Sequence, residues 1–384
     1  MFYTFAKLDN TLMTQNFHTY KEILQQPKVW LKTLDYVLAH KQEIMEFTEK
    51  YLRSGYEIVL TGAGTSAYIG DALEPALFET RFRGARAIAT TDVLTNPQMF
   101  FDGESKVLLV SFARSGNSPE SIGAIKAVEK TAGKVAHIFI TCNKDGELAK
   151  KQGDNILCIL LPPETNDLSL AMTSSYSTMM LCCSMIANIG RIEQDAPLIR
   201  EVAACVEIAM AKYESAIEKL ASRDFHRAIF LGSGPLKGVA EECRLKLQEL
   251  TDGAVMCAFD SFLGFRHGPK AVVKEDSLLV YLISPNPDVR RYEMDLIRQI
   301  KANNNVKGVL VAGFQKPELG EEYFDLCIET GINPSMPACY GAVSFAFVGQ
   351  MLGMFKSVNI GLCPDTPSIS GNISRVVEGV TLYI

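Results

Sequence analysis

Apolar segments of strand length alternate with glycine-rich turns and amphipathic segments from about residue 57 onward. The pattern occurs at 57–77 (EIVLTGAGTSAYIGDALEPAL) and at 106–130 (KVLLVSFARSGNSPESIGAIKAVEK), and a third strand follows at 134–143 (KVAHIFITCN). Runs such as IVLTG and VLLVS are apolar at successive positions, which indicates strands that are buried on both faces. Strands that alternate with helices in this way predict an α/β fold, with a parallel sheet covered by helices.

The same pattern returns about 170 residues later. Its second copy occupies 227–250, 277–300 and 306–314, and Gly62 of the first turn is matched by Gly232. One shared glycine-rich turn would be weak evidence, but three units with a common offset indicate a tandem duplication.

The duplication divides the chain into three parts. We expect a helical lead-in at 1–50, where apolar residues recur at helical spacing, a first domain at 51–222 and a second domain at 223–384. A charged, Ala-rich segment at 193–220 is predicted to be the helix that joins the two halves.

Composition restricts the partners and the compartment. The 384 residues are 47% hydrophobic with a formal charge of -6, and scattered Lys and Arg disfavour nucleic acid as a partner. Ten cysteines without a C-x-x-C pair or metal-ligand spacing, and a start without the apolar core of a signal peptide, predict a cytoplasmic protein without a metal. The longest apolar run is taken to be 278–283, well below the roughly 20 residues that span a bilayer, so no membrane partner is expected.

A Ser- and Gly-rich segment follows the second predicted strand. The sequence SFARSGNSPES at 111–121 leads into a predicted helix, with Ser118 at the N-cap and Pro119 in the first turn. Small residues leave N–H groups and hydroxyls free to converge on an anion, which the helix dipole favours. We expect a phosphate cradle, with an ordinary capped turn as the alternative. Neither G-x-x-x-x-G-K-[ST] nor G-x-G-x-x-G fits, so a nucleotide is disfavoured.

Two glutamates and one histidine in the second half have the chemistry of proton transfer. Glu242 and Glu249 are seven residues apart in a predicted helix, so they lie on nearly one face. His267 stands in GFRHGPK, where Gly268-Pro269 predicts a loop. A helical carboxylate and a loop imidazole suit the opening of a sugar ring and the movement of a proton between C1 and C2. The alternatives are solvated or ion-paired glutamates and an ordinary surface histidine.

Seven segments carry a family resemblance. In order, they are TGAGTSAYIGD (61–71), VSFARSGNSPES (110–121), AMTSSYSTMM (171–180), LGSG (231–234), LKLQELTDG (245–253), FRHGPK (265–270) and CPDTPSISGNISRVVEGV (363–380). Together they resemble the AgaS family of sugar isomerase (SIS) proteins, over the chain past about residue 25. Members are galactosamine-6-phosphate deaminases or tagatose-6-phosphate ketose/aldose isomerases. The resemblance implies two tandem flavodoxin-like SIS domains, a sugar-phosphate ligand and no metal or organic cofactor.

A more distant resemblance is to the isomerase half of glucosamine-6-phosphate synthase, and it implies roles for individual residues. The implied phosphate contacts are Ser66, Ser115, Ser118 and Thr173. The implied proton-transfer base is Glu249, with Glu242 as a helper carboxylate and His267 as the ring-opening group.

Two arginines mark departures from the synthase. Arg114 stands where the synthase has Gln, and we expect it to add a charge-assisted contact to substrate. The synthase forms an imine with its ketose through a near-terminal Lys, whereas here Arg375 is the nearest basic residue. A guanidinium stays protonated and cannot form that imine.

The resemblance leaves the direction of the reaction to be chosen. The synthase draws ammonia from a fused glutaminase that this chain lacks, so we expect the reverse sense, an isomerising deaminase acting on galactosamine 6-phosphate. A plain aldose-ketose isomerase and a non-catalytic sugar-phosphate sensor are the alternatives. The resemblance also implies a homodimer or higher homo-oligomer in which the FRHGP loop reaches the neighbouring subunit's site.

Overall fold

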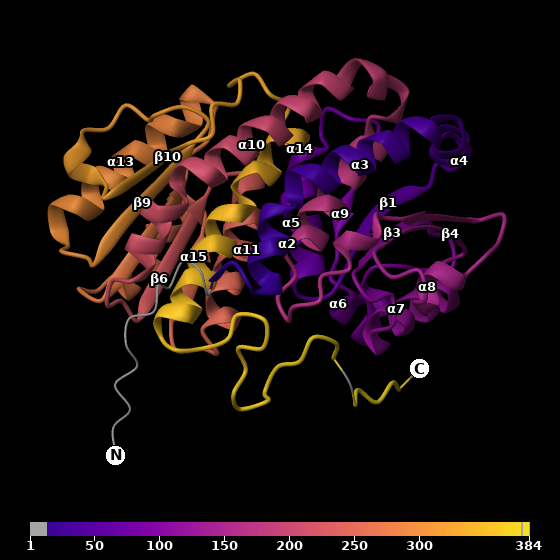
Figure 1. Ribbon diagram of the computed structural model, residues 1–384. Coiled ribbons are helices and arrows are strands. Elements are labelled where there is room, and N and C mark those ends of the chain that lie inside the picture. Colours follow the sequence, from indigo (N-terminus) through magenta and orange to yellow (C-terminus); the bar gives the residue numbers. More distant parts are fainter. Residues whose placement is uncertain (1–13, 378, 384) are drawn as a thin grey trace.

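A computed structural model describes residues 14–377 and 379–383 and contains two parallel sheets with helices between them (Figure 1). The strands of the first sheet are β1 (Glu57–Thr61), β2 (Arg86–Ala87), β3 (Lys106–Ala113), β4 (Lys134–Thr141) and β5 (Ile156–Leu160). Their order is β2-β1-β3-β4-β5, and all pairs are parallel. This is the flavodoxin-like order.

The second sheet repeats this topology. Its strands are β6 (Arg227–Gly232), β7 (Met256–Asp260), β8 (Ser277–Leu282), β9 (Gly308–Gly313) and β10 (Leu326–Glu329). Read from the β7 edge, their order is β7-β6-β8-β9-β10, which is again flavodoxin-like, with parallel pairs throughout. The expected α/β fold with two tandem parallel sheets is therefore confirmed.

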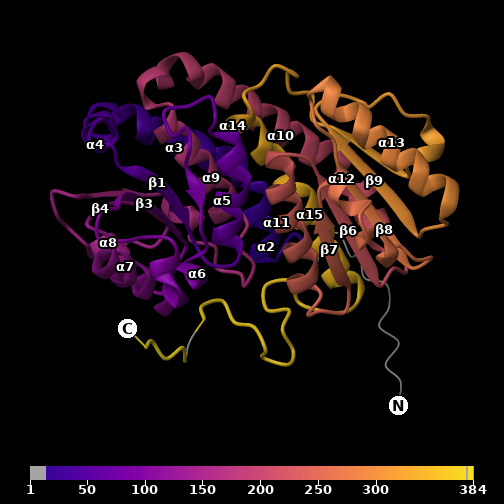
Figure 2. The same cartoon turned by 180° about the vertical axis from the view of Figure 1, so that it is seen from behind.

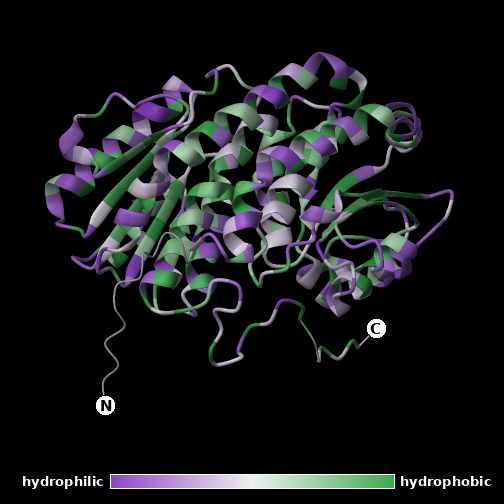
Figure 3. Cartoon of the chain, viewed as in Figure 1, coloured by the Kyte–Doolittle hydropathy of each residue, from purple (hydrophilic) through white to green (hydrophobic). Residues whose placement is uncertain are grey.

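Helices fill the space between the sheets. They are α2 (His18–Leu24), α3 (Gln26–Ala39), α4 (Lys41–Arg53), α5 (Thr65–Ala76), α9 (Ser174–Ala187), α10 (Ile192–Ala221), α11 (Pro235–Leu250), α14 (Ala338–Gly341) and α15 (Ala346–Asn359). Together with the inner faces of both sheets they form one large apolar core. In Figure 3 the strands and central helices are mostly green, the colour of hydrophobic residues. Helices α2 to α4 fall in the expected lead-in, of which residues 1–13 lie outside the described residues, and α10 contains the expected joining helix at 193–220.

Each sheet also carries helices on its outer face. They are α6 (Thr90–Thr95), α7 (Pro119–Thr131), α8 (Glu147–Lys150), α12 (Phe262–Phe265) and α13 (Pro287–Asn303). Each outer face forms a smaller apolar core of its own. Burial on both faces explains the continuous apolar runs of the strands.

Helix α11 is wedged between α5 and α15. A Cβ atom on Gly238 would lie 2.4 Å from the backbone N of Ala72 in α5. A Cβ on Gly349 of α15 would lie 2.4 Å from Cα of Cys243. Because only glycine allows these approaches, the wedge brings the second domain's first helix against the first domain's first helix.

One sequence interpretation needs correction. The longest apolar stretch is not 278–283, because the helical segment Ala338–Asn359 has the length and composition of a membrane span. Its most apolar 18-residue window is 94% buried inside the protein, as in a core helix. Its apolar character therefore reflects its place between the two sheets.

Candidate functional site

A cavity opens at the carboxyl edge of the first sheet, between the turns after β1 and β3. In a sheet of this order, those two strands are where the strand order reverses, and ligands bind there. The cavity volume is about 140 Å³. Its lining residues are Ala63, Ser66, Phe112, Ala113, Arg114, Ser115, Ser118, Glu120, Ser121, Met172, Arg375, Val376 and Val377. Three of the four predicted phosphate ligands therefore face one cavity.

The turn after β3 has the predicted cap. Ser118 is the N-cap of α7, and its Oγ accepts a hydrogen bond from the backbone N of Ser121 (3.3 Å). Pro119 occupies the first turn, as expected. Gly116 has a φ of 64°, which lets the chain turn from strand to helix. The local geometry thus joins hydroxyls and a helix N-terminus in one cavity, which favours an anion.

Arg114 lies in the wall of this cavity, but its guanidinium is already bound to backbone. Nη1 donates to the carbonyl oxygens of Ser169 (3.2 Å) and Leu170 (3.1 Å), and Nη2 donates to the carbonyl oxygen of Arg375. The side chain is buried. These hydrogen bonds hold three segments of the cavity wall together. They are a role that the sequence analysis, which expected a contact to substrate, did not include.

The C-terminal tail crosses from the second domain to the first and closes one side of the cavity (Figure 1). Arg375 anchors it through Nε to the carbonyl oxygen of Asp167 (2.8 Å) and through Nη2 to Oδ1 of Asn166 (3.0 Å). Upstream, the Asp365 carboxylate accepts from the backbone N of His18 (3.0 Å) and of Thr19 (2.8 Å) at the start of α2. Arg375 thus reaches the cavity, with its donors on backbone and amide oxygens.

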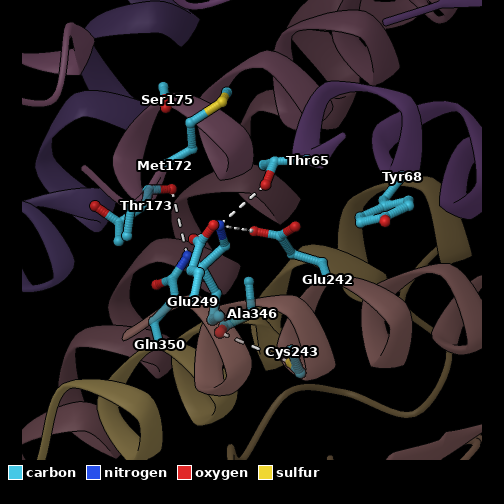
Figure 4. A network of polar contacts seen from close by, with 12 residues as sticks. Thr65, Tyr68, Met172, Thr173, Ser175, Glu242, Cys243, Glu249, Ala346 and Gln350 are labelled. Atoms are coloured by element: carbon cyan, nitrogen blue, oxygen red, sulfur yellow. Dashed lines mark hydrogen bonds and ion pairs between the residues drawn. The ribbon is translucent and has the colours of Figure 1, made fainter. Parts of the chain in front are cut away.

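Thr173, the fourth predicted phosphate ligand, does not line the cavity. Its neighbour Met172 does, while Thr173 is fully buried and its hydroxyl has no hydrogen-bond partner among the described residues. Its backbone N donates to Asp167 Oδ2 (2.8 Å), and Gln350 Nε2 donates to its carbonyl oxygen (3.3 Å; Figure 4). In this structure, Thr173 supports the wall from behind.

A buried ionic cluster lies on α11 beside the cavity. The ammonium of Lys246 is 3.3 Å from Glu242 Oε1, forms an ion pair with Glu249 and donates to Thr65 Oγ1 (3.0 Å). Figure 4 shows Thr65, Glu242 and Glu249 turned toward one another. Because Ser66 follows Thr65 and lines the cavity, the cluster and the cavity meet at the first turn of α5.

The pKa values within the cluster differ because burial acts differently on acids and bases. Burial raises the pKa of Glu242 to about 8, with Lys246 opposing the rise and Glu249 adding to it. Burial alone would lower the pKa of Lys246, but the two carboxylates outweigh it and raise that pKa. Burial therefore favours the neutral form of Glu242, while Lys246 stays an ammonium beside it.

Lys246 is the residue that sequence reasoning missed. It stands four residues after Glu242 and three before Glu249, so all three share one face of α11. A lysine between two glutamates on a predicted buried helix was the available signal. Its side chain has no exposed surface, and removing it would leave buried carboxylates without a cation.

His267 lies away from this cluster within the chain. It is exposed and follows α12, which packs on the outer face of the second sheet, whereas α11 packs on the inner face (Figure 2). One chain therefore does not bring His267 and Glu249 together. Among the described residues, no group of three or more His, Cys, Asp and Glu side chains is placed to hold a metal ion.

The chain is similar in sequence to a known domain family and to several known proteins. The SIS domain model matches residues 51–189. A protein of Shewanella sp. (strain ANA-3) named D-galactosamine-6-phosphate deaminase AgaS is 36% identical over 375 residues, which cover 96% of this chain and 92% of the relative. A protein of Escherichia coli with the same name is 34% identical over 375 residues, which cover 95% of each chain.

A solved structure resembles the whole chain. The tagatose-6-phosphate ketose/aldose isomerase from Escherichia coli superposes with a TM-score of 0.86 at 33% identity, covering 96% of this chain and 97% of that one.

The buried Glu242 carboxyl leads to a prediction about stability. A carboxyl whose pKa rises from 4.5 to about 8 on folding holds its proton more tightly in the folded state. The folded protein then loses stability as pH rises through that interval. Glu242→Gln, which is neutral throughout, should remove this part of the pH dependence, at most about 4 kcal/mol between pH 5 and pH 8.

Urea unfolding at several pH values measures this effect. The exposed Glu104→Gln change is the control and should leave the wild-type pH dependence intact. Parallel curves for wild type and Glu242→Gln would show that Glu242 is ionised in the folded protein.

Proposed function

Because the chain belongs to the AgaS family of SIS-domain proteins, we propose that it is an isomerising deaminase that converts galactosamine 6-phosphate to tagatose 6-phosphate and ammonia. The observation that carries this proposal is the Glu242–Lys246–Glu249 cluster, placed beside a hydroxyl-lined cavity through the first turn of α5. Such a reaction belongs to amino-sugar breakdown in the cytoplasm, as in N-acetylgalactosamine catabolism.

The sugar phosphate group binds in the cavity of the first domain. Ser66, Ser115 and Ser118 supply hydroxyls there, and the N-terminus of α7 favours negative charge. Thr173 contributes through the wall behind the cavity, and Arg114 and Arg375 add positive charge to it while holding it together. This grip fixes the far end of the sugar, so that C1 and C2 are held for proton transfer.

Glu249 is the base that removes the proton from C2. It is the carboxylate of the cluster that retains some exposure, and its partner Lys246 has a raised pKa and stays protonated. Glu242, protonated near neutral pH, is a helper that can donate a proton rather than accept one.

Removal of the C2 proton from the open-chain 2-amino aldehyde gives an enolamine. Return of the proton to C1 then turns the enolamine into a ketimine at C2. Water then hydrolyses the ketimine to the ketose phosphate and ammonia. Because Lys246 is held as an ammonium between two carboxyl groups, it is unsuited to form an imine with the substrate. The reaction therefore proceeds on the amino group of the sugar itself.

Ring opening calls for a second subunit. We place the partner subunit's His267 at the site of each chain, in a homodimer, because His267 and Glu249 lie on opposite faces of the second sheet within one chain. Exposure of His267 leaves its imidazole available for such a contact.

A second activity shares the same groups. The structural likeness to a tagatose-6-phosphate ketose/aldose isomerase supports aldose-ketose isomerisation at this site, since that reaction also needs ring opening and proton transfer from C2 to C1. The two differ only in whether C2 carries nitrogen or oxygen.

The reaction class is tested by comparing products. We expect ammonia release from galactosamine 6-phosphate to exceed ketose formation from galactose 6-phosphate, with glucosamine 6-phosphate tested alongside for the C4 epimer. Glu249→Gln keeps the shape of the side chain but removes the base, so kcat should fall at least ~100-fold with little change in KM. Full activity in this variant would exclude Glu249 as the base.

The phosphate cradle is tested at Ser115, whose hydroxyl faces the cavity without capping the helix. Ser115→Ala should raise KM for galactosamine 6-phosphate by roughly 10-fold or more, because a hydrogen bond to a charged group is lost. Ser54→Ala, which removes an exposed hydroxyl bonded only to the Lys50 carbonyl, is the matched control. An unchanged KM in Ser115→Ala would contradict the cradle.

Subunit complementation tests the placement of His267. Glu249→Gln and His267→Asn should each be nearly inactive alone. When they are mixed and allowed to exchange subunits, half of the dimers combine one intact Glu249 with one intact His267 at a single site, so about a quarter of wild-type activity should return. No recovery, with exchange verified by mass spectrometry, would mean that both groups act within one chain.

A further inference from the structure

The second domain has a cavity at the position that corresponds to the candidate site of the first. It lies at the carboxyl edge of the second sheet, between the turns after β6 and β8, where the order of that sheet reverses. Its volume of about 300 Å³ exceeds that of the first cavity and reaches the size of small-molecule sites. The fold thus offers a second ligand position.

The backbone around this cavity has the same conformation as the backbone around the first cavity, but the side chains that line it differ. Gly234 has φ 56° and ψ -127°, and Gly64 has φ 54° and ψ -128°, so the turn after the first strand is the same in both domains. Leu236 stands where the first domain has Ser66, and the turn after β8 reads SPNP in place of RSGNSP. Hydroxyl groups have been exchanged for apolar ones.

This second cavity is unsuited to phosphate. No Lys or Arg is among the residues that line it. The N-terminus of α13 is capped as that of α7 is, because Asn286 Oδ1 accepts from the backbone N of Asp288 (2.9 Å) and of Val289 (3.5 Å), so the missing cations are what distinguish the two cavities. Asp288 adds negative charge to that first turn.

A buried carboxyl lies beneath the floor. Glu293 of α13 has no exposed surface, and its Oε2 accepts from the backbone N of Ser284 (2.9 Å). Its Oε1 has no hydrogen-bond partner among the described residues, and the Ser233 side chain is a polar neighbour of the carboxyl. Ser233 and Ser284 both line the cavity, so the carboxyl stands directly behind its polar floor.

The pKa of the Glu293 carboxyl lies near neutral pH. Burial raises its pKa to about 7, and the hydrogen bonds from Ser233 and Ser284 and the charge of Arg290 oppose the rise only in part. A positive group above Ser233 and Ser284 would favour the ionised carboxylate and would complete its electrostatic pairing.

We propose that the second cavity binds a small organic cation with an apolar body, its ammonium directed at Ser233 and Ser284 above Glu293. The walls formed by Leu236, Phe314 and Met336 exclude water from the apolar body, and the Phe314 ring offers a surface for it. The lack of a lining cation disfavours phosphorylated sugars. The ligand therefore differs in class from the substrate of the first domain, and the site is independent of the proposed reaction.

Binding of phenethylammonium to the full-length protein, followed by ligand-observed NMR and calorimetry, tests this proposal. The neutral 2-phenylethanol and the anionic phenylacetate have similar apolar bodies and serve as comparisons. We expect the ammonium to bind about 10-fold more tightly than the alcohol, the ratio that one charge-assisted contact supplies, and the carboxylate to bind least.

Two variants locate the binding. Glu293→Gln should abolish the preference for the ammonium over the alcohol while leaving the alcohol's affinity unchanged. Val289→Trp, at the partly exposed wall, should weaken all of them by filling the cavity. Asp295→Asn, an exposed acid on the same helix, is the matched control and should change neither.

Three results would overturn the proposal: no binding of the ammonium, equal affinity for ammonium and alcohol in the wild type, or binding that survives Val289→Trp. Thermal unfolding of each variant establishes that it is folded, and Val289→Trp decides the location independently of Glu293→Gln.

Discussion

The close approach of α11 to α5 is the contact on which the rest of the site depends. Gly238 lets the α11 backbone pack directly on Ala72, and this brings Lys246 within hydrogen-bond distance of Thr65. The ion-paired groups come from the second domain, whereas the hydroxyl-lined cavity belongs to the first. Neither domain alone would place a charged pair beside the cavity. The two glycine-mediated helix contacts are what bring the pair to the cavity.

The burial of α11 between the two domains also explains why the cluster contains a lysine. Two carboxyl groups on one buried face are costly unless a cation and a proton compensate them. Lys246 supplies the cation for Glu249, and Glu242 keeps its proton near neutral pH. The two neighbouring acids on one helix thus have different surroundings, because Glu242 is fully buried and Glu249 keeps some exposure.

Sequence patterns predicted the fold well because the periodicity of strands and helices is local. The continuous apolar runs predicted the parallel strands, and the offset of about 170 residues between the two copies of the pattern predicted the second sheet. Heptad spacing also placed Glu242 and Glu249 on one face. The features that the sequence did not predict depend on contacts between distant segments. The donors of Arg114 and Arg375 bind carbonyl oxygens, and Thr173 lies behind the cavity wall. His267 lies on the outer side of the second sheet. None of these is encoded in a local pattern, and the roles of the site residues stay predictions.

The C-terminal tail gives this protein an order of assembly. Asp365 satisfies the backbone N–H groups at the start of α2, and Arg375 binds the segment before α9, so residues that follow the second domain's last helix complete a wall of the first domain. During synthesis, the first sheet and its helices leave the ribosome long before these partners do. One wall of the first domain's cavity is therefore absent until residues 375–377 have been made.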